Sequence, residues 1–252
     1  MQQPLASSGS CDPCPGHSFG RRGRRRRGFL ATAFLGFSAA SAVAQTPLEM
    51  ERFKSLAIDA PAAARSSEPA RVLSPVELVR ELRKGGYVLF FRHAATDMSQ
   101  DDRNARSLTD CGNQRSLSAR GRNDARAIGL VFAELRIPIG RVLASPVCRA
   151  DETATLIFGR SEHSNDLIGD PDFRSSDPRR YSGLKELFMT PVSTGANLGI
   201  ASHGNPFRAV AGLPGIAEGE MAMIRPMGTD FEVVARVRPE AWPGIAFAAK
   251  AK

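Results

Sequence analysis

Short apolar runs separated by amphipathic segments organise the chain from residue 74 onward. Three runs are mainly apolar and four to six residues long, at 87–92, 141–144 and 198–201. Such runs are typical of strands that are buried on both faces of a parallel sheet. Each run is followed by a segment with helical periodicity, so the pattern predicts alternating strands and helices.

The predicted helices have recognisable ends. Ser74-Pro75-Val76-Glu77 is a capping box with proline at the first helical position, and Gly85-Gly86 ends that helix. Ser118 caps a second helix. The apolar face of this second helix has the 3.6-residue period, at Ala125, Ile128, Val131, Phe132 and Leu135. Shorter helices are predicted over 149–158, 184–189 and 204–212.

Two further strands, 221–224 and 231–237, flank a Pro-Met-Gly-Thr turn at 226–229 and predict a hairpin at the edge of the sheet. The stretches 94–116 and 159–181 are polar and are predicted as loops. The order of elements predicts an α/β fold, namely a three-layer α/β/α sandwich on a largely parallel central sheet with an edge hairpin.

The net charge of +8 is unevenly distributed along the 252 residues. Residues 1–44 hold six arginines and one acid, which leaves 28 basic and 25 acidic residues in 45–252. The part after residue 44 has no basic stripe with interleaved aromatic residues, so we expect no nucleic-acid partner.

The first 44 residues resemble a bacterial export signal. Arg26-Arg27-Gly28-Phe29-Leu30 fits the twin-arginine pattern, an apolar stretch follows, and Ala42-Val43-Ala44 is a small-x-small cleavage site. We therefore expect cleavage after Ala44, a periplasmic or secreted protein, and no stable membrane span once the signal is removed. A Sec-type signal and an uncleaved anchor are the alternatives.

Composition divides the rest of the chain. Residues 45–70 are rich in Ala, Pro and Ser and are predicted as a linker, 71–240 as the folded domain and 241–252 as a C-terminal tail. Cys111 and Cys148 remain after signal removal. In an oxidising compartment they either form a disulfide or stay as two buried thiols.

Charged residues follow each buried strand of the predicted sheet. Arg92 and His93 end the first strand, Arg149 comes shortly after the second, and His203 follows the third. In open α/β sheets, ligands bind beyond the carboxyl ends of the strands, so these side chains are expected to meet in one crevice. Arginine forks bind phosphate oxygens, and a neutral imidazole can attack phosphorus to form a phosphohistidine.

Four segments between residues 86 and 226 resemble motifs of the histidine phosphatase superfamily, the phosphoglycerate-mutase-like fold. They are Arg-His-Ala-Ala-Thr at 92–96, Leu-Ser-Ala-Arg-Gly at 117–121, Ser-Pro-Val-Cys-Arg-Ala-Asp-Glu-Thr-Ala at 145–154 and Ser-His-Gly at 202–204. The resemblance implies that His93 is the nucleophile and that Arg92, Arg149 and His203 bind the phosphate. Ala94 stands where the family has glycine.

The general acid is left open by the resemblance. The acid-phosphatase branch uses an Asp directly after the second histidine, where this chain has Gly204. Asp97 lies four residues after the expected nucleophile and is our candidate acid, with loop capping as its other interpretation. The further carboxylates considered are Asp170, Asp172, Asp177 and Glu186.

Several other residues have weaker assignments. Thr96 and Ser99, in the loop after His93, are candidates for substrate binding. Arg115 and Arg120, near the start of the second helix, either extend the anion-binding pocket or are surface charges, the second being the default. Glu218 and Glu220 are expected to be solvated loop residues. No carboxylate stands at metal-ligand spacing from the two histidines, and arginines repel cations, so we expect neither a metal nor a cofactor.

The resulting hypothesis is an exported, metal-independent phosphomonoesterase that acts on a small phosphorylated substrate through a phosphohistidine on His93. The alternative is a non-catalytic envelope module that binds phosphate or phosphosugars on the same fold. Presence of both His93 and His203 favours the enzyme, because a simple phosphate binder needs only the arginines. The oligomeric state is not addressed by the sequence.

Overall fold

The computed structural model describes residues 66–169 and 180–251. The expected export signal and almost all of the expected linker therefore lie outside the described residues. No helix in the described part of the chain combines the length and the apolar character needed to cross a bilayer.

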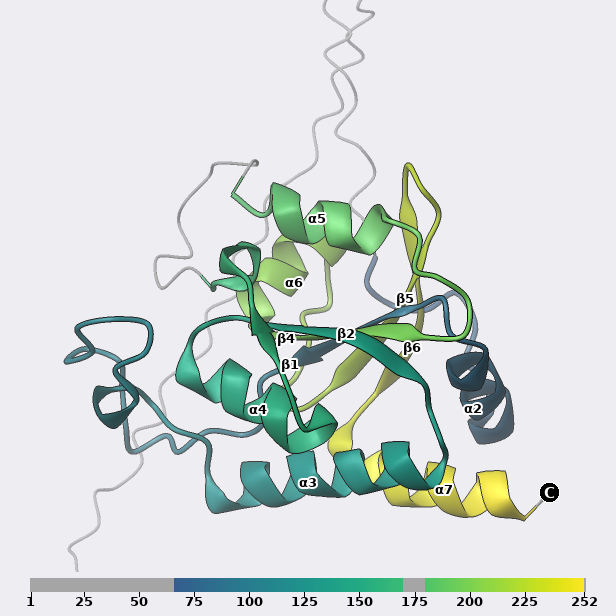
Figure 1. Cartoon of the computed structure of the whole chain (residues 1–252), viewed down its shortest axis with the longest axis horizontal. Helices are drawn as coiled ribbons and strands as arrows, with labels where there is room; N and C mark the ends of the chain where they lie inside the picture. Colours follow the sequence, from purple (N-terminus) through teal and green to yellow (C-terminus); the bar gives the residue numbers. More distant parts are fainter. Residues whose placement is uncertain (1–65, 170–179, 252) are drawn as a thin grey trace, which may run out of the picture. The chain divides into compact units, whose positions relative to one another are not determined.

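A six-stranded mixed sheet forms the centre of the domain (Figure 1). Its strand order is β3-β2-β4-β1-β5-β6, in which the first four strands pair in parallel and β5 pairs antiparallel with both β1 and β6. The strands are β1 (Val88–Arg92), β2 (Ile139–Ala144), β3 (Glu162–His163), β4 (Asn197–Ser202), β5 (Met221–Pro226) and β6 (Phe231–Val237). The predicted largely parallel sheet with an edge hairpin is confirmed.

Helices cover both faces of this sheet, with α5 and α6 on one side and α3 and α7 on the other (Figure 1). The helices are α2 (Pro75–Lys84), α3 (Ala119–Glu134), α4 (Cys148–Phe158), α5 (Ser182–Met189), α6 (Gly204–Ala211) and α7 (Trp242–Lys250). The three-layer α/β/α architecture follows from the sequence of β1, since every second side chain enters the same core. Leu89 and Phe91 join the core under α2, α3 and α7, whereas Val88 and Phe90 join the core under α5 and α6.

The predicted helix caps of α2 and α3 are present. The Ser74 hydroxyl accepts the Glu77 N–H at 3.3 Å, and Glu77 accepts the Ser74 N–H at 2.9 Å. At α3, the Ser118 hydroxyl accepts the Gly121 N–H at 3.0 Å. These bonds satisfy N–H groups that have no partner within the helix.

The stretch after residue 240 is a helix and not a tail. Trp242, Ile245 and Ala246 of α7 are buried in the core shared with α2 and α3. The apolar spacing i, i+3, i+4 that buries them is present in the sequence but occupies a single helical turn. Packing against α2 and α3 is therefore what stabilises helix α7.

The folded domain also begins earlier than residue 71. Ser67 is fully buried, its N–H donates to the Leu213 carbonyl at 3.0 Å, and its hydroxyl donates to the Pro214 carbonyl. Arg236 donates to the same hydroxyl at 3.2 Å. The end of the expected linker is thus bound to the segment 213–220, which contacts Arg92 at the end of β1.

Two glycine-to-alanine substitutions should have opposite effects on stability. A Cβ at Gly121 would lie 2.1 Å from the Ala95 carbonyl oxygen, so the backbones would have to separate. We expect Gly121→Ala to lower the free energy of unfolding by about 1–3 kcal/mol, as overpacking does. Gly244 lies exposed in α7 with open space around it, and Gly244→Ala should raise stability by up to about 1 kcal/mol. Urea denaturation of both variants measures this, and equal effects would contradict the close contact at Gly121.

Candidate active site

The carboxyl ends of β1, β2 and β4 bring the predicted residues together. Arg92 pairs with Ser202 across β1 and β4, and Ala144 of β2 pairs with Ala201. The residues that follow these positions, His93, Ser145 and His203, therefore leave the same edge of the sheet. Parallel pairing is the reason that segments 110 residues apart in sequence meet here.

The two histidine rings face one another in a buried setting. His93 is 3% exposed and His203 is 5% exposed, and their ring centroids lie 5.5 Å apart at an interplanar angle of 63°. His93 Nδ1 lies 3.0 Å from the Ala94 carbonyl oxygen, which can only accept, so Nδ1 donates its proton there. The lone pair of His93 is consequently on Nε2.

Burial and positive charge keep both histidines neutral. Burial lowers the pKa of His93 well below its ordinary value, and His203, Arg149 and Arg92 lower it further. Burial likewise lowers the pKa of His203 to about 3, again with Arg149 and Arg92 contributing. His203 Nε2 is 3.0 Å from the Ser145 hydroxyl, which holds the ring in place.

Three guanidinium groups converge beside these rings. The Nε atoms of Arg92, Arg115 and Arg149 are buried without a hydrogen-bond partner among the described residues. Burial lowers the pKa of Arg92 and of Arg149, and the positive charge of Arg115 lowers both further. A buried N–H without a partner costs about 1–3 kcal/mol, which an anion bound between the arginines would remove.

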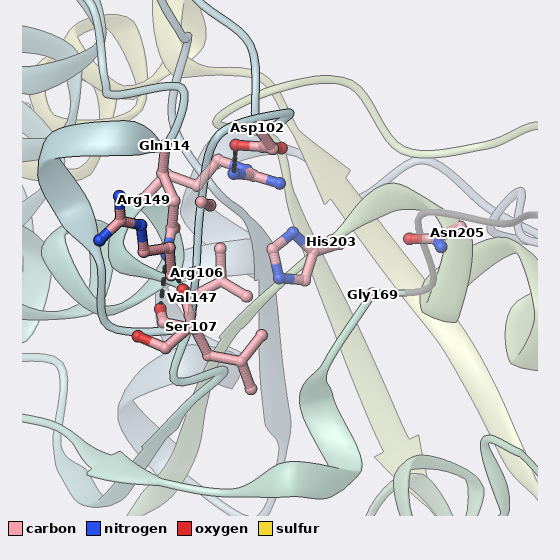
Figure 2. Close-up of a pocket in the computed structure, with 11 residues that line it drawn as sticks. Asp102, Arg106, Ser107, Gln114, Val147, Arg149, Gly169, His203 and Asn205 are labelled. Carbon is pink, nitrogen blue, oxygen red and sulfur yellow. Dashed lines mark hydrogen bonds and ion pairs between the residues drawn. The ribbon is translucent and has the colours of Figure 1, made fainter.

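These groups line a pocket of about 320 Å³ that contains four arginines and both histidines. Its lining residues are Arg92, His93, Arg115, Arg149, His203, Gly204, Asn205, Arg208, Gly215 and Ile216. A second pocket of about 420 Å³ shares Arg149, His203 and Asn205 with it (Figure 2). The first pocket has the charge and size to hold a phosphate dianion, and the second can hold the group attached to it.

Two carboxylates compensate for the concentrated positive charge. Glu218 accepts from Arg92 Nη2 at 3.2 Å and also from the N–H and the hydroxyl of Thr96, at 3.2 and 3.1 Å. Asp102 accepts from Arg149 Nη1 at 3.1 Å. The expectation that Glu218 is a solvated loop residue is wrong, because its three partners hold it against the site.

Glu220 is also structural. It is 4% exposed and forms a two-pronged ion pair with Arg236, at 2.9 and 2.8 Å, while accepting the Ala217 N–H at 2.7 Å. This pair fixes the segment 214–220, whose Ile216 carbonyl accepts from Arg92 Nη1 at 3.1 Å. Arg92 is thus oriented through a buried network.

Three of the predicted residues are not directed at the pockets. Asp97 accepts the N–H and the hydroxyl of Ser99, at 3.0 and 2.7 Å, and these bonds lower the pKa of its exposed carboxyl. Asp97 and Ser99 therefore stabilise their own loop. Thr96 is buried but donates to Glu218, and it lines neither pocket.

Of the four other carboxylates that the sequence offers as an acid, only Glu186 lies in the described part of the chain. Asp170, Asp172 and Asp177 lie outside the described residues. Glu186 is exposed on α5 and lines neither pocket. The described residues contain no group of three or more His, Cys, Asp or Glu placed to hold a metal ion.

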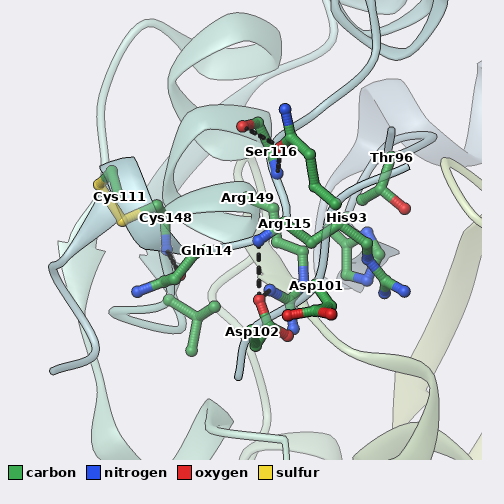
Figure 3. Close-up of polar contacts among 12 residues, drawn as sticks. His93, Thr96, Asp101, Asp102, Cys111, Gln114, Arg115, Ser116, Cys148 and Arg149 are labelled. Atoms are coloured by element: carbon green, nitrogen blue, oxygen red, sulfur yellow. Dashed lines mark hydrogen bonds and ion pairs between the residues drawn. A yellow bond between two sulfur atoms is a disulfide. The ribbon is translucent and has the colours of Figure 1, made fainter. Parts of the chain in front are cut away.

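A disulfide joins Cys111 to Cys148, with the Cα atoms 5.6 Å apart (Figure 3). Gln114 reinforces this link: its side-chain oxygen accepts the Cys148 N–H at 3.2 Å, and its amide donates to the carbonyls of Ser107 and Leu108, at 3.1 and 2.8 Å. The loop between β1 and α3 is thereby attached to the start of α4, where Arg149 lies.

For Arg115, the structure favours the alternative in which it extends the anion-binding pocket over the default of a surface charge. The sequence pattern does not identify Asp102, Gln114 or Glu218 as parts of the site. Asp102 and Glu218 carry no sequence signal, because each is defined only by the arginine that it contacts.

The lowered pKa of His203 makes stability depend on pH. Its folded-state pKa of about 3 is below the unfolded value of 6.5, so its contribution is complete above pH 6.5 and decreases as the pH falls toward 3. Between pH 7.5 and 5, this one group should lower the free energy of unfolding by on the order of 2 kcal/mol.

We expect His203→Gln to reduce that pH-dependent loss in urea denaturation at the two pH values. His163→Gln, which removes a half-exposed histidine of β3, is the matched control. The same loss in His203→Gln and in the unmodified protein would show that His203 is not held neutral.

Residues 88–190 match the family described as histidine phosphatase superfamily (branch 1). No curated protein matches the chain.

Several solved structures are similar over most of their own length. A SixA protein from Agrobacterium tumefaciens, described as a phosphohistidine phosphatase, has 15% identity and a TM-score of 0.44, covering 61% of this chain and 99% of its own. The protein histidine phosphatase SixA in complex with tungstate has 17% identity and a TM-score of 0.43, and the match covers 61% of this chain and 97% of that protein. An Entamoeba histolytica phosphoserine phosphatase mutant in complex with phosphoserine has 10% identity and a TM-score of 0.43, covering 61% and 98%. All three TM-scores are below 0.5, and the family match is confined to residues 88–190.

Proposed function

Because the chain belongs to the histidine phosphatase superfamily, we propose that it is a phosphomonoesterase that works through a phosphohistidine on His93. The observation that carries the proposal is the neutral His93, with its Nε2 lone pair beside three guanidinium groups whose Nε atoms have no partner in the described part of the chain. A nucleophile without positive charge and a strongly cationic pocket are what phosphoryl transfer to nitrogen requires.

The reaction proceeds in two steps. The phosphate dianion binds to Arg92, Arg115 and Arg149, which reduces its repulsion of the nucleophile. His93 Nε2 then forms a bond to phosphorus as the bond to the leaving oxygen breaks. Water subsequently attacks phosphorus, the nitrogen–phosphorus bond breaks, and inorganic phosphate is released.

His203 supports the transferring group. His203 Nε2 lies 3.0 Å from the Ser145 hydroxyl. In the proposed mechanism this hydroxyl donates to Nε2, so that the ring carries its single proton on Nδ1 and can donate that proton to a phosphoryl oxygen. A neutral donor suits this position because the arginines already provide the positive charge. The two adjoining pockets, of about 320 and 420 Å³, suit a small phosphorylated substrate.

The proposal includes action without a metal ion. Cations are repelled by the arginines that line the phosphate pocket, and these arginines provide the charge stabilisation that a metal would otherwise supply. Activity should therefore persist in EDTA.

Turnover of p-nitrophenyl phosphate in EDTA tests the function. We expect His93→Ala to lower kcat by at least about 10³-fold, because the covalent route is lost. His163→Ala, on β3 and outside the two pockets, should retain the original rate. Acid quenching during turnover should trap one acid-labile phosphoryl group per chain, detected as a mass increase that is absent in His93→Ala.

Other results would favour other functions. Absence of turnover, with vanadate still bound, would support the non-catalytic phosphate-binding module. Turnover that is retained in His93→Ala would contradict the phosphohistidine mechanism.

We further propose that the protein is exported and acts in the periplasm or outside the cell. The disulfide between Cys111 and Cys148 supports this, since disulfides persist in oxidising compartments. The twin-arginine-like sequence at residues 26–30 and the cleavage site ending at Ala44 provide the route.

Export is tested by expressing the full chain in bacteria and fractionating the cells. We expect a periplasmic form that begins at Gln45 and has no free thiol. Replacement of Arg26 and Arg27 by lysine should leave the precursor in the cytoplasm. Continued export of the lysine variant would indicate a Sec-type signal, and an uncleaved membrane-bound form would indicate an anchor.

A further inference from the structure

Asp102 occupies a distinctive position at the edge of the active site. It lies in the loop between β1 and α3, and its Oδ1 accepts from Arg149 Nη1 at 3.1 Å and from the Arg115 N–H at 2.8 Å (Figure 3). Its other carboxylate oxygen, Oδ2, forms no hydrogen bond with the described residues. Asp102 is also close enough to His203 for its negative charge to oppose the lowering of that residue's pKa.

The loop that carries Asp102 is held in place. The Asp102 carbonyl accepts the Ala105 N–H at 3.2 Å, and Gln114 binds the carbonyls of Ser107 and Leu108. The Cys111–Cys148 disulfide attaches the same loop to α4. A carboxylate in such a setting has the fixed position that proton transfer requires.

His93 and Asp102 line two adjoining pockets that share Arg149 and His203. The smaller pocket is lined by His93 and not by Asp102, whereas the larger pocket, drawn in Figure 2, is lined by Asp102 and not by His93. In phosphoryl transfer, the attacking and leaving atoms lie in line on opposite sides of phosphorus. With a phosphate in the smaller pocket and His93 Nε2 as the attacking atom, we assign the leaving oxygen, and later the hydrolytic water, to the larger pocket, which Asp102 lines.

We propose that Asp102 is the general base that activates water for hydrolysis of the phosphohistidine, an inference that rests on the proposed function. The Asp102 carboxylate takes a proton from water as the water oxygen bonds to phosphorus. The nitrogen–phosphorus bond breaks and its electron pair returns to His93 Nε2. Inorganic phosphate leaves, and the proton on Asp102 passes to solvent.

Three other carboxylates near Asp102 form hydrogen bonds with residues of their own surroundings and do not line the larger pocket. Glu218 is bound by Arg92 and by two groups of Thr96, and it lines neither pocket. Asp97 is bound by Ser99. Asp101, next to Asp102, accepts from the N–H and the Nε of Arg103 at the surface. Asp102 lines the larger pocket, whereas Asp97, Asp101 and Glu218 do not.

The test compares Asp102→Asn with Asp101→Asn as its matched control, using p-nitrophenyl phosphate. Its phenolate departs without protonation, so the first step does not depend on a proton donor. We expect Asp102→Asn to lower kcat by about 10²–10³-fold, as loss of a general base does, while kcat/KM changes by only a few fold. Rapid mixing should show a burst of one equivalent of p-nitrophenolate and an accumulated phosphohistidine. Asp101→Asn should behave like the unmodified protein.

A positioning role for Asp102 predicts different results. If Asp102 served only to orient Arg149, substrate capture would weaken, so kcat/KM would fall and no phosphoenzyme would accumulate. Formate added to Asp102→Ala should raise kcat if the missing group is a base, and should leave it unchanged if the group only positions Arg149.

An unchanged kcat in Asp102→Asn, or a loss of kcat/KM without phosphoenzyme, would overturn the proposal. Failure of the phosphohistidine mechanism itself is recognised separately, because His93→Ala would then remain active and no phosphoenzyme would form in any variant.

Discussion

Concentration of positive charge at the carboxyl edge of the sheet is the constraint on which the active site depends. Burial lowers the pKa of Arg92 and of Arg149, and the positive charge of the nearby Arg115 lowers both further. Each such group must be held in place against desolvation and mutual repulsion. Glu218 and Asp102 provide the opposing charges, at 3.2 Å from Arg92 and 3.1 Å from Arg149.

The supporting network follows from that requirement. Glu218 belongs to the segment 214–220, which the buried pair of Glu220 and Arg236 ties to the edge hairpin. Asp102 belongs to a polar loop that has little core of its own and is tied to α4 by a disulfide and by Gln114. Two loops with few apolar contacts thereby obtain fixed positions from polar and covalent links.

The same positive field determines the chemistry of the histidines. Burial and arginine charge disfavour the imidazolium form, so His93 keeps at neutral pH the lone pair that the proposed attack on phosphorus requires. The hydrogen bond from His93 Nδ1 to the Ala94 carbonyl places that lone pair on Nε2. Ala94 lies in a position where the family has glycine, and its small side chain is accommodated in the buried core.

Local patterns along the chain predict most of the architecture. The capping residues Ser74 and Ser118, the apolar runs of β1, β2 and β4, and the turn at 226–229 each correspond to an element of the structure. Helix α7 was missed because its apolar pattern spans one turn and becomes informative only when Trp242 meets α2 and α3. Ser67 was assigned to the linker because two backbone and side-chain bonds to residues 213–214 leave no trace in local composition.

The residues of the candidate site also fall into two groups, those that the sequence predicts and those that only the tertiary structure identifies. The sequence by itself determined that Arg92, His93, Arg149 and His203 meet, since each follows a buried parallel strand and such strands end at one edge of a sheet. Only the tertiary structure decided that Arg115 lies with them. It also decided that Asp97 forms hydrogen bonds with Ser99. Likewise, it placed the carboxylates of Asp102 and Glu218 against Arg149 and Arg92. The physical reason is that strand ends are specified by local hydrophobic pattern, whereas the partner of a loop charge is specified by contacts across 47 to 126 residues of chain.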